Sequence, residues 1–396
     1  MTAGRAGGAR PARALVPAVI ALGSVFARAG LTQEALQRLT GISSPDDIGL
    51  LNHAPALERL RGQRAAAAVL ARLFYLEAEE SHRSIAMVLS RAEVARFVTA
   101  GLLARTRGGV RARLRVDIVQ QRYVLADRRF EPPDARALGL PPGDMVYPPG
   151  GDSAILAEVV EGLEGERVLD VCTGSGVQGV VAAARAGHVW MTDISARAAA
   201  VAGANTVLNR LNNVTTLVGD LFRPLGSERF DLIIANPPFV PGPRRGPAYH
   251  SGGARGDRVL RRILAGLGAR LLPNGRAVLI SHVALRAGET PTTALASGLR
   301  GFPGRVLILS LESGTPIDLA AAQAVFALRR GLTAYAREVR TWTAYLHRHG
   351  IERIVALLIV AERRGRRRID LVDGARRVLP IPLSRSPREH VIDWLS

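Results

Sequence analysis

Residues 168–179 constrain the fold most strongly, because they read as a buried strand that runs into a glycine-rich turn and then a helix. An apolar run that ends at Val171 is followed by Gly174, Gly176 and Gly179. Glycines in such a turn let the backbone approach a ligand closely at the start of a helix. The segment therefore predicts an α/β domain with a ligand site at the carboxyl end of this strand.

Strand-like apolar runs alternate with helical stretches over the remainder of the chain. The runs lie at 167–172, 188–192, 215–218, 230–235, 276–281, 306–311 and 354–360. Strands that alternate with helices predict a parallel, doubly wound sheet. The expected fold class is thus α/β, with a Rossmann-like sheet of seven strands.

Two classes of cofactor fit the glycine-rich turn. Read literally, Gly174 to Gly179 matches the GxGxxG pattern of dinucleotide-binding proteins, with Asp193 near the right distance to bind a ribose. The glycines alone leave a nicotinamide-dependent oxidoreductase and an S-adenosylmethionine enzyme open. Asp170 favours the second, because a carboxylate there attracts a cationic amino-acid group and repels a pyrophosphate. Asp220, at the end of the next strand, can accept a hydrogen bond from an adenine amino group.

The tetrapeptide Asn236-Pro237-Pro238-Phe239 follows the apolar run 230–235. Its prolines cannot donate to a sheet ladder, so they end the strand and hold Asn236 extended. An amide oxygen and a backbone carbonyl held together can accept both hydrogens of a planar NH2 group. That arrangement turns the nitrogen lone pair toward an electrophile, while Phe239 can stack on a flat substrate. The alternative is a strand-terminating loop with a structural asparagine.

With these residues in place, the chain resembles the class I S-adenosylmethionine-dependent methyltransferases, specifically the amino-methylating group with an Asn-Pro-Pro-Tyr/Phe motif. That group includes release-factor glutamine, ribosomal-RNA guanine N2 and adenine N6 methyltransferases. The resemblance covers residues 145–285 well and extends loosely to 361. It implies S-adenosylmethionine as cofactor and an N-methyltransferase acting on a planar amino or amide nitrogen. Phe239 replaces the tyrosine usual in the glutamine enzymes, so the substrate is not carried over.

The resemblance implies a role for each site residue. The catalytic residues would be Asn236, Pro237 and Phe239. The residues expected to bind the cofactor are Asp170, Thr173, Gly174, Gly176, Asp193, Ile194, Asp220, Leu221 and Asn236. Within this set Asp170, Gly174 and Gly176 would line the methionine part, Asp193 would hold the ribose hydroxyls and Asp220 would meet the adenine. For Asp193, a simple cap of the following helix is the alternative.

Two further segments bear on the site. His250-Ser251-Gly252-Gly253 and Gly256-Asp257 look like the glycine-rich loop that follows the motif in the glutamine enzymes. The single cysteine, Cys172, and the scattered histidines give no ligand set, so we expect no metal.

Two domains joined by a linker are expected, and the first domain is residues 1–135, which read as helices followed by strands. Ser90 and Glu93 form a capping box, and an alternation over 110–118 predicts a half-buried strand with 123–125 pairing back on it. A short helix leading into a basic hairpin resembles a winged-helix module for substrate recognition, with a substrate lid or a dimer surface as alternatives. A proline-rich linker is expected at 136–150, and the methyltransferase domain at 151–396.

The first residues of the chain permit two interpretations. Arg5, Arg10 and Arg13 precede the apolar stretch 15–26, which resembles a targeting segment. We favour a first helix of the folded domain, because no convincing cleavage site follows. No apolar run reaches membrane-spanning length, and a cytoplasmic location is expected.

Charge indicates the partner only weakly. All 53 basic residues are arginine against 34 acids, a net charge of +19, but the excess is spread along the chain. The densest run, residues 363–368, is predicted to be a solvated hairpin turn. The methyl acceptor is left open between RNA, a protein glutamine and a small metabolite, with a basic adaptor that has lost catalysis as a remote alternative. The sequence predicts no oligomeric state.

Overall fold

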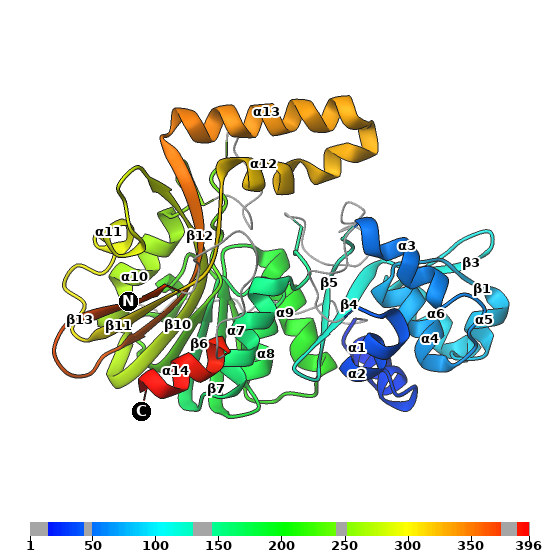
Figure 1. Cartoon of the computed structure of the whole chain (residues 1–396). Coiled ribbons are helices and arrows are strands. Elements are labelled where there is room, and N and C mark those ends of the chain that lie inside the picture. The colour runs from blue at the N-terminus through cyan, green and yellow to red at the C-terminus, as the bar shows by residue number, and fades with distance from the viewer. Residues whose placement is uncertain (1–14, 43–49, 130–144, 243–251, 374–385, 396) are drawn as a thin grey trace, which may run out of the picture. The chain divides into compact units, whose positions relative to one another are not determined.

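The computed structural model describes residues 15–42, 50–129, 145–242, 252–373 and 386–395 (Figure 1). The chain forms two compact units, one of residues 1–164 and 168–224 and the other of residues 165–167 and 225–396. The division predicted at the proline-rich linker stays a prediction, and residues 136–144 of that linker lie outside the described residues. So do Arg5, Arg10, Arg13, His250 and Ser251.

The first unit begins with helices that share one hydrophobic core. Helix α1 (Leu15–Arg28) buries residues spaced three and four apart, among them Leu22 and Phe26, as expected for a core helix. The helices that follow are α2 (Gln33–Thr40), α3 (Leu50–Arg59), α4 (Ala66–Leu70), a π-helical turn (Ala71–Tyr75), α5 (His82–Ala86) and α6 (Arg91–Thr99). Among the described residues, no single helix is long and apolar enough to cross a membrane. The bent pair α1 and α2 passes that test jointly, by length and composition only.

Short strands accompany these helices. Strands β1 (Glu80–Ser81), β3 (Gly109–Ala112) and β2 (Leu103–Arg105) form one sheet in that order, and helix α6 has the predicted capping box. Strands β4 (Leu114–Val119) and β5 (Arg122–Asp127) pair as an antiparallel hairpin, which confirms the predicted pairing. The winged-helix interpretation stays a prediction.

The strand expected over 110–118 is wrong in two respects. It is interrupted at Arg113, which separates β3, paired with β2, from β4, paired with β5. In addition, β4 is buried on both faces rather than half-buried, because Arg115 and Asp117 satisfy each other inside the unit. An alternation of apolar and charged residues therefore does not always mark a solvent face.

Helix α9 (Ala196–Leu208) fastens the β4–β5 hairpin within the first unit. The Asn205 side chain exchanges hydrogen bonds with the backbone N–H and carbonyl of Leu125, at 2.7 and 2.8 Å. Asn209, just beyond the helix, does the same with Tyr123, and a buried ion pair joins Arg197 of the helix to Asp127. These contacts place the hairpin and α9 in one packed body.

The rest of the first unit holds the predicted cofactor strands. Strands β6 (Gly165–Val171, of which residues 168–171 belong to this unit), β7 (Ala186–Asp193) and β8 (Val214–Val218) lie in that order, and β7 and β8 are parallel. Helices α7 (Gly151–Glu161) and α8 (Val177–Ala182) flank the glycine turn in sequence. Helix α7 has Gly150 at its N-terminal cap.

The second unit contains five sheet strands. They are β9 (Phe230–Ala235), β10 (Leu271–Arg286), β11 (Arg305–Gly314), β12 (Ile351–Glu362) and β13 (Arg368–Asp373). Their order is β13-β11-β12-β10-β9. Its helices are α10 (Arg258–Arg270), α11 (Pro291–Leu295), α12 (Pro316–Ala324), α13 (Leu332–Arg348) and α14 (Pro387–Leu395).

The strand directions correct the expected all-parallel sheet of seven. Strand β12 is antiparallel to both β10 and β11, whereas β9 is parallel to β10. Strand β13 follows the arginine-rich turn and pairs in parallel with β11, so the two units together contribute eight strands. The connection from β11 to β12 runs through α12 and α13, which lie side by side (Figure 1).

Candidate functional site

The glycine turn of the first unit is built from residues in a left-handed conformation. Strand β6 ends at Val171, and Cys172, Gly174 and Gly176 then have φ angles of 59°, 55° and 82°. The Thr173 backbone N–H donates to the Thr192 carbonyl on β7 at 3.1 Å, which ties the turn to the neighbouring strand. Residues that carry a side chain rarely adopt positive φ. This accounts for the glycines at two of these three positions.

The glycines of the turn serve two different purposes. A Cβ added at Gly176 would lie 2.9 Å from the Cβ of Ala202, and one at Gly179 would lie 2.4 Å from the Met191 sulfur. Those two positions are glycine because the helix and the strand pack closely there. A Cβ at Gly174 would meet no atom within 4 Å, so this glycine borders open space.

Asp170 holds the turn in shape. Its side chain is 1% exposed, and its Oδ2 accepts hydrogen bonds from the Thr173 hydroxyl at 2.5 Å and the Gly179 backbone N–H at 3.0 Å. Burial raises the pKa of Asp170 to about 7, although both hydrogen bonds lower it and the charge of Asp193 adds a smaller rise. Asp170 is therefore a carboxyl group that an adjacent positive charge would ionise near neutral pH.

Asp193 connects the turn to the end of β7. Its Oδ2 accepts from the Gly174 backbone N–H at 2.9 Å and its Oδ1 from the Ser195 backbone N–H at 2.8 Å. Burial raises its pKa, while these backbone hydrogen bonds lower it. The simple-cap interpretation of Asp193 is wrong, because the residue that caps α9 is Ser195, whose hydroxyl accepts from Ala198.

The remaining predicted cofactor residues follow the ends of β7 and β8. Ile194 is 64% exposed, so an apolar side chain lies at the surface directly after β7. Gly219 donates its N–H to the Asp193 carbonyl at 2.8 Å, which brings these two strand ends together. Asp220 begins the turn after β8, and Leu221 has a φ of 51°.

These features fit a nucleoside cofactor with a cationic end. Open space borders Gly174, an exposed apolar side chain lies at Ile194 for a flat base, and a buried carboxyl group lies behind the turn at Asp170. All of them belong to the first unit, on strands β6 and β7 or directly after them.

In the second unit, the predicted catalytic motif follows β9. The strand ends at Ala235, as the prolines of the following motif require. Five of the six strand residues are buried. Asn236 is partly exposed and Pro237 is buried. The motif thus begins where a fully packed strand reaches the surface of the unit.

The Phe239 ring has a partner that the sequence did not predict. It stacks on the His282 imidazole of β10, with ring centroids 4.2 Å apart and planes inclined by 9°. No motif marks His282, and only the neighbouring positions of β9 and β10 in the sheet bring the two rings together. One face of Phe239 is therefore covered within the protein.

The glycine-rich loop after the motif packs against it. A Cβ at Gly256 would lie 2.0 Å from the Phe239 carbonyl oxygen, and Gly256 has a φ of 80°. Gly252 donates its N–H to the Val240 carbonyl at 3.1 Å, and Tyr345 of α13 donates its hydroxyl to the Ala254 carbonyl at 3.0 Å. No side chain fits between the loop and the motif at Gly256, and at Gly252 a Cβ would lie 2.0 Å from the Gly256 carbonyl oxygen within the loop itself.

The predicted site residues divide between the two units. Asp170, Thr173, Gly174, Gly176, Asp193, Ile194, Asp220 and Leu221 belong to the first unit, and Asn236, Pro237 and Phe239 to the second. Sequence reasoning missed Asn205, whose side chain donates to the Ser175 carbonyl of the glycine turn at 2.8 Å, and it missed His282. Neither residue lies in a recognisable motif.

Two family profiles match the chain. Residues 151–296 match the Methyltransferase small domain, and residues 28–113 match a domain of unknown function, DUF7059. The first match contains every predicted site residue.

Curated relatives also match part of the chain. The chain is 40% identical over 139 residues to a ribosomal protein uL3 glutamine methyltransferase of Bradyrhizobium diazoefficiens, covering 32% of this chain and 44% of the relative. It is 33% identical over 176 residues to a release factor glutamine methyltransferase of Gloeobacter violaceus, covering 40% and 60%. A release factor glutamine methyltransferase of Bordetella pertussis is 33% identical over 208 residues, covering 48% of this chain and 74% of the relative. The chain thus spans about half the length of the first two.

Proposed function

Because the chain belongs to the class I S-adenosylmethionine-dependent methyltransferases, we propose that it methylates a planar amide nitrogen, that of a glutamine side chain in a translation-associated protein. The observation that carries the proposal is the motif Asn236-Pro237-Pro238-Phe239 at the end of β9, inside the region that matches the Methyltransferase small domain. Membership of this family supports S-adenosylmethionine, rather than a nicotinamide, as the ligand of the glycine turn.

In the proposed reaction, Asn236 and Pro237 orient the acceptor. The Asn236 side-chain oxygen and the Pro237 carbonyl each accept one hydrogen of the NH2 group. An amide nitrogen is a weak nucleophile because its lone pair is delocalised, so fixing both hydrogens presents the lone pair to the methyl group. The rigid prolines supply this geometry before the substrate arrives, which favours transfer through proximity and orientation.

Phe239 provides a flat surface beside this nitrogen. Since His282 covers one face of its ring, the acceptor amide packs against the remaining face or edge. Phe239 lacks the hydroxyl of a tyrosine, and the proposed chemistry does not need one. The stack with His282 fixes the plane of the Phe239 ring.

The first unit holds the cofactor in this proposal. Bound S-adenosylmethionine supplies an electrophilic methyl group on a cationic sulfur. Asp193 accepts from the ribose hydroxyls, Ile194 and Leu221 cover the adenine, and Asp220 accepts from its amino group. Asp170 keeps Thr173 and the Gly179 backbone in place and stabilises the cationic end of the cofactor through its charge.

The substrate class rests on the relatives. All three named above act on a glutamine of a protein, either a release factor or ribosomal protein uL3. A ribosomal RNA base is the rival acceptor, since the chain carries a net charge of +19. The relatives favour the protein, and the predicted cytoplasmic location follows from a translation-associated substrate.

An Asn236→Ala variant tests the assigned role. We expect it to keep its affinity for S-adenosylhomocysteine and to lose turnover by about 10²–10³-fold, as when one preorganised polar group is removed from an active site. Calorimetric titration measures the affinity, and transfer of a labelled methyl group measures turnover. Lost affinity with retained turnover per bound complex would contradict the role given to Asn236.

A further inference from the structure

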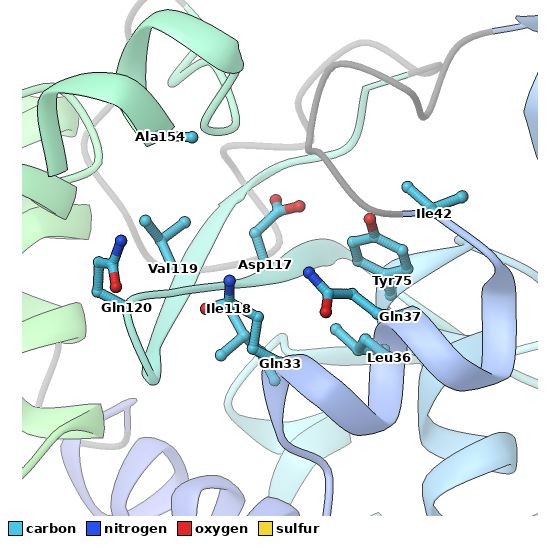
Figure 2. Close-up of a pocket in the computed structure, with 10 residues that line it drawn as sticks. All are labelled: Gln33, Leu36, Gln37, Ile42, Tyr75, Asp117, Ile118, Val119, Gln120 and Ala154. Carbon is cyan, nitrogen blue, oxygen red and sulfur yellow. The ribbon is translucent and has the colours of Figure 1, made fainter. Parts of the chain in front are cut away.

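A small pocket lies in the N-terminal part of the first unit, apart from the glycine turn. It has a volume of about 60 Å³, and α2, β4, the turn after β4 and the start of α7 contribute to its walls (Figure 2). Ligand pockets for nucleotides or drug-sized molecules are roughly 300–1,000 Å³, whereas a water molecule takes about 30 Å³. The pocket therefore has room for a head group of a few atoms. We call it the Asp117 pocket.

Asp117 and Tyr75 are fixed in the wall by a buried arginine. Arg115 donates to both Asp117 carboxylate oxygens, at 2.8 and 2.7 Å, and to the Tyr75 carbonyl at 2.6 Å. Its guanidinium carbon also lies 4.4 Å from the Tyr75 ring centroid. Each carboxylate oxygen has two acceptor positions, and Arg115 takes one on each. Asp117 thus keeps acceptor capacity for a further donor, and its carboxylate points to the same side as the Tyr75 hydroxyl (Figure 2).

The pocket wall contrasts with the charge of the chain. The protein has 53 arginines, yet none lines this pocket. Its polar groups are the Asp117 carboxylate, the Tyr75 hydroxyl and the amides of Gln33, Gln37 and Gln120. Burial raises the pKa of Tyr75 to about 12, so the phenol stays neutral. Arg115 lies behind the wall and pairs with Asp117, and the described lining residues themselves include no cation, so the open side of the pocket presents hydrogen-bond acceptors to a cation from elsewhere.

A second carboxylate lies next to this wall. Glu34 follows Gln33 in α2, is exposed, and accepts a hydrogen bond from the Gln121 amide at 2.5 Å. Hydrogen bonds from the backbone, Thr32 and Gln121 lower its pKa, so it is ionised at neutral pH. This charge strengthens the preference for a cation.

Unusual backbone geometry shapes the same wall. Gln120 and Gln121 form the β4–β5 turn with φ angles of 45° and 59°, where asparagine and glycine are the preferred residues. Tyr75 ends a π-helical turn, a feature often found at functional sites. Positive φ at both central residues is what a two-residue type I′ hairpin turn requires, so the turn itself accounts for the angles at Gln120 and Gln121.

We propose that the Asp117 pocket binds the guanidinium or ammonium head of an arginine or lysine side chain of a protein partner. The cation donates hydrogen bonds to Asp117 and to the glutamine amide oxygens, and its aliphatic stem passes Leu36, Ile42 and Val119. If the proposed function holds, the partner is the protein substrate. The binding itself needs no cofactor and no methyl transfer.

The test uses the full-length protein and small probes without the cofactor. N-acetylarginine amide and N-acetyllysine amide should give saturable signals in saturation-transfer NMR titrations, and N-acetylglutamate amide should give none. Gln37→Arg places a positive charge in the pocket. It should lower the affinity for the arginine probe about fivefold to tenfold, because like charges repel. Gln63→Arg is the matched control, because Gln63 is exposed and outside the pocket wall, and should leave the affinity unchanged.

The choice of Gln37 avoids the buried ion pair. Asp117→Asn would leave the fully buried Arg115 without its partner and destabilise the unit. Gln37→Glu should raise the affinity for the arginine probe. The proposal is overturned if the glutamate probe binds as well as the arginine probe, or if Gln37→Arg and Gln63→Arg change the affinity equally. Methyl-transfer assays are read separately, so failure here leaves the proposed function standing.

Discussion

At the scale of single residues, the glycine turn combines backbone strain with buried charge. Gly174 and Gly176 both have positive φ, but only Gly176 is packed against other side chains. Asp170 lies behind them with a raised pKa. Shape and protonation at the turn can therefore be tested by separate substitutions.

Gly174→Ala and Gly176→Ala should have different effects. Both introduce left-handed strain of roughly 1–2 kcal/mol. Gly176→Ala also drives its methyl group to 2.9 Å from the Ala202 Cβ, so it should lower the melting temperature more. Gly174→Ala should mainly weaken the binding of S-adenosylhomocysteine, because the new alanine methyl group projects into open space. Thermal unfolding and calorimetry measure the two effects, and equal losses of stability would contradict this distinction.

The raised pKa of Asp170 predicts that the stability of the cofactor-free protein depends on pH. Its carboxyl group loses its proton near pH 3.8 in the unfolded chain and near 7 in the folded protein. Between these values the folded state binds more protons, so stability falls as the pH rises. The melting temperature of the wild type should drop relative to Asp170→Asn from about pH 4 to about pH 7. Parallel curves over this range would contradict the buried, raised carboxyl group.

At the scale of elements, α9 links the N-terminal hairpin to the glycine turn. Asn205 contacts Leu125 of β5 and the Ser175 carbonyl of the turn with one side-chain amide. Asn209 makes the same type of contact with Tyr123 but none with the turn. The helix thus offers a matched pair of asparagines, one coupled to the cofactor site and one not.

Asn205→Leu and Asn209→Leu should separate stability from cofactor binding. Each removes three hydrogen bonds and should cost about 1–3 kcal/mol of unfolding free energy. Of the two variants, only Asn205→Leu should weaken the binding of S-adenosylhomocysteine, because of these two asparagines only Asn205 donates a hydrogen bond to the Ser175 carbonyl. Denaturant titration and calorimetry check the two claims. If both variants bound the ligand as the wild type does, α9 would have no influence on the turn.

At the scale of the whole molecule, local rules predicted more than long-range contacts did. The end of β9 at Ala235 follows from two prolines, and the capping box at Ser90 from the sequence spacing, so both were predicted correctly. The antiparallel direction of β12 depends on how α12 and α13 return the chain, which no short pattern encodes.

The site shows the same division. The glycine turn and the motif were recognisable because their chemistry is written in consecutive residues. The burial of Arg115 depends on Tyr75, which lies 40 positions away, and the stack on Phe239 depends on His282 in a neighbouring strand. Such partners are decided by packing and were not predictable.

The central claim is the transfer of a methyl group to a glutamine amide of a protein. The most direct measurement incubates the protein with methyl-labelled S-adenosylmethionine and separate protein and RNA fractions of translation components, with Asn236→Ala as control. The account predicts label in the protein fraction, located on a glutamine side chain by mass spectrometry and absent with the variant. Label in RNA, or label in protein at a residue other than glutamine, would contradict it.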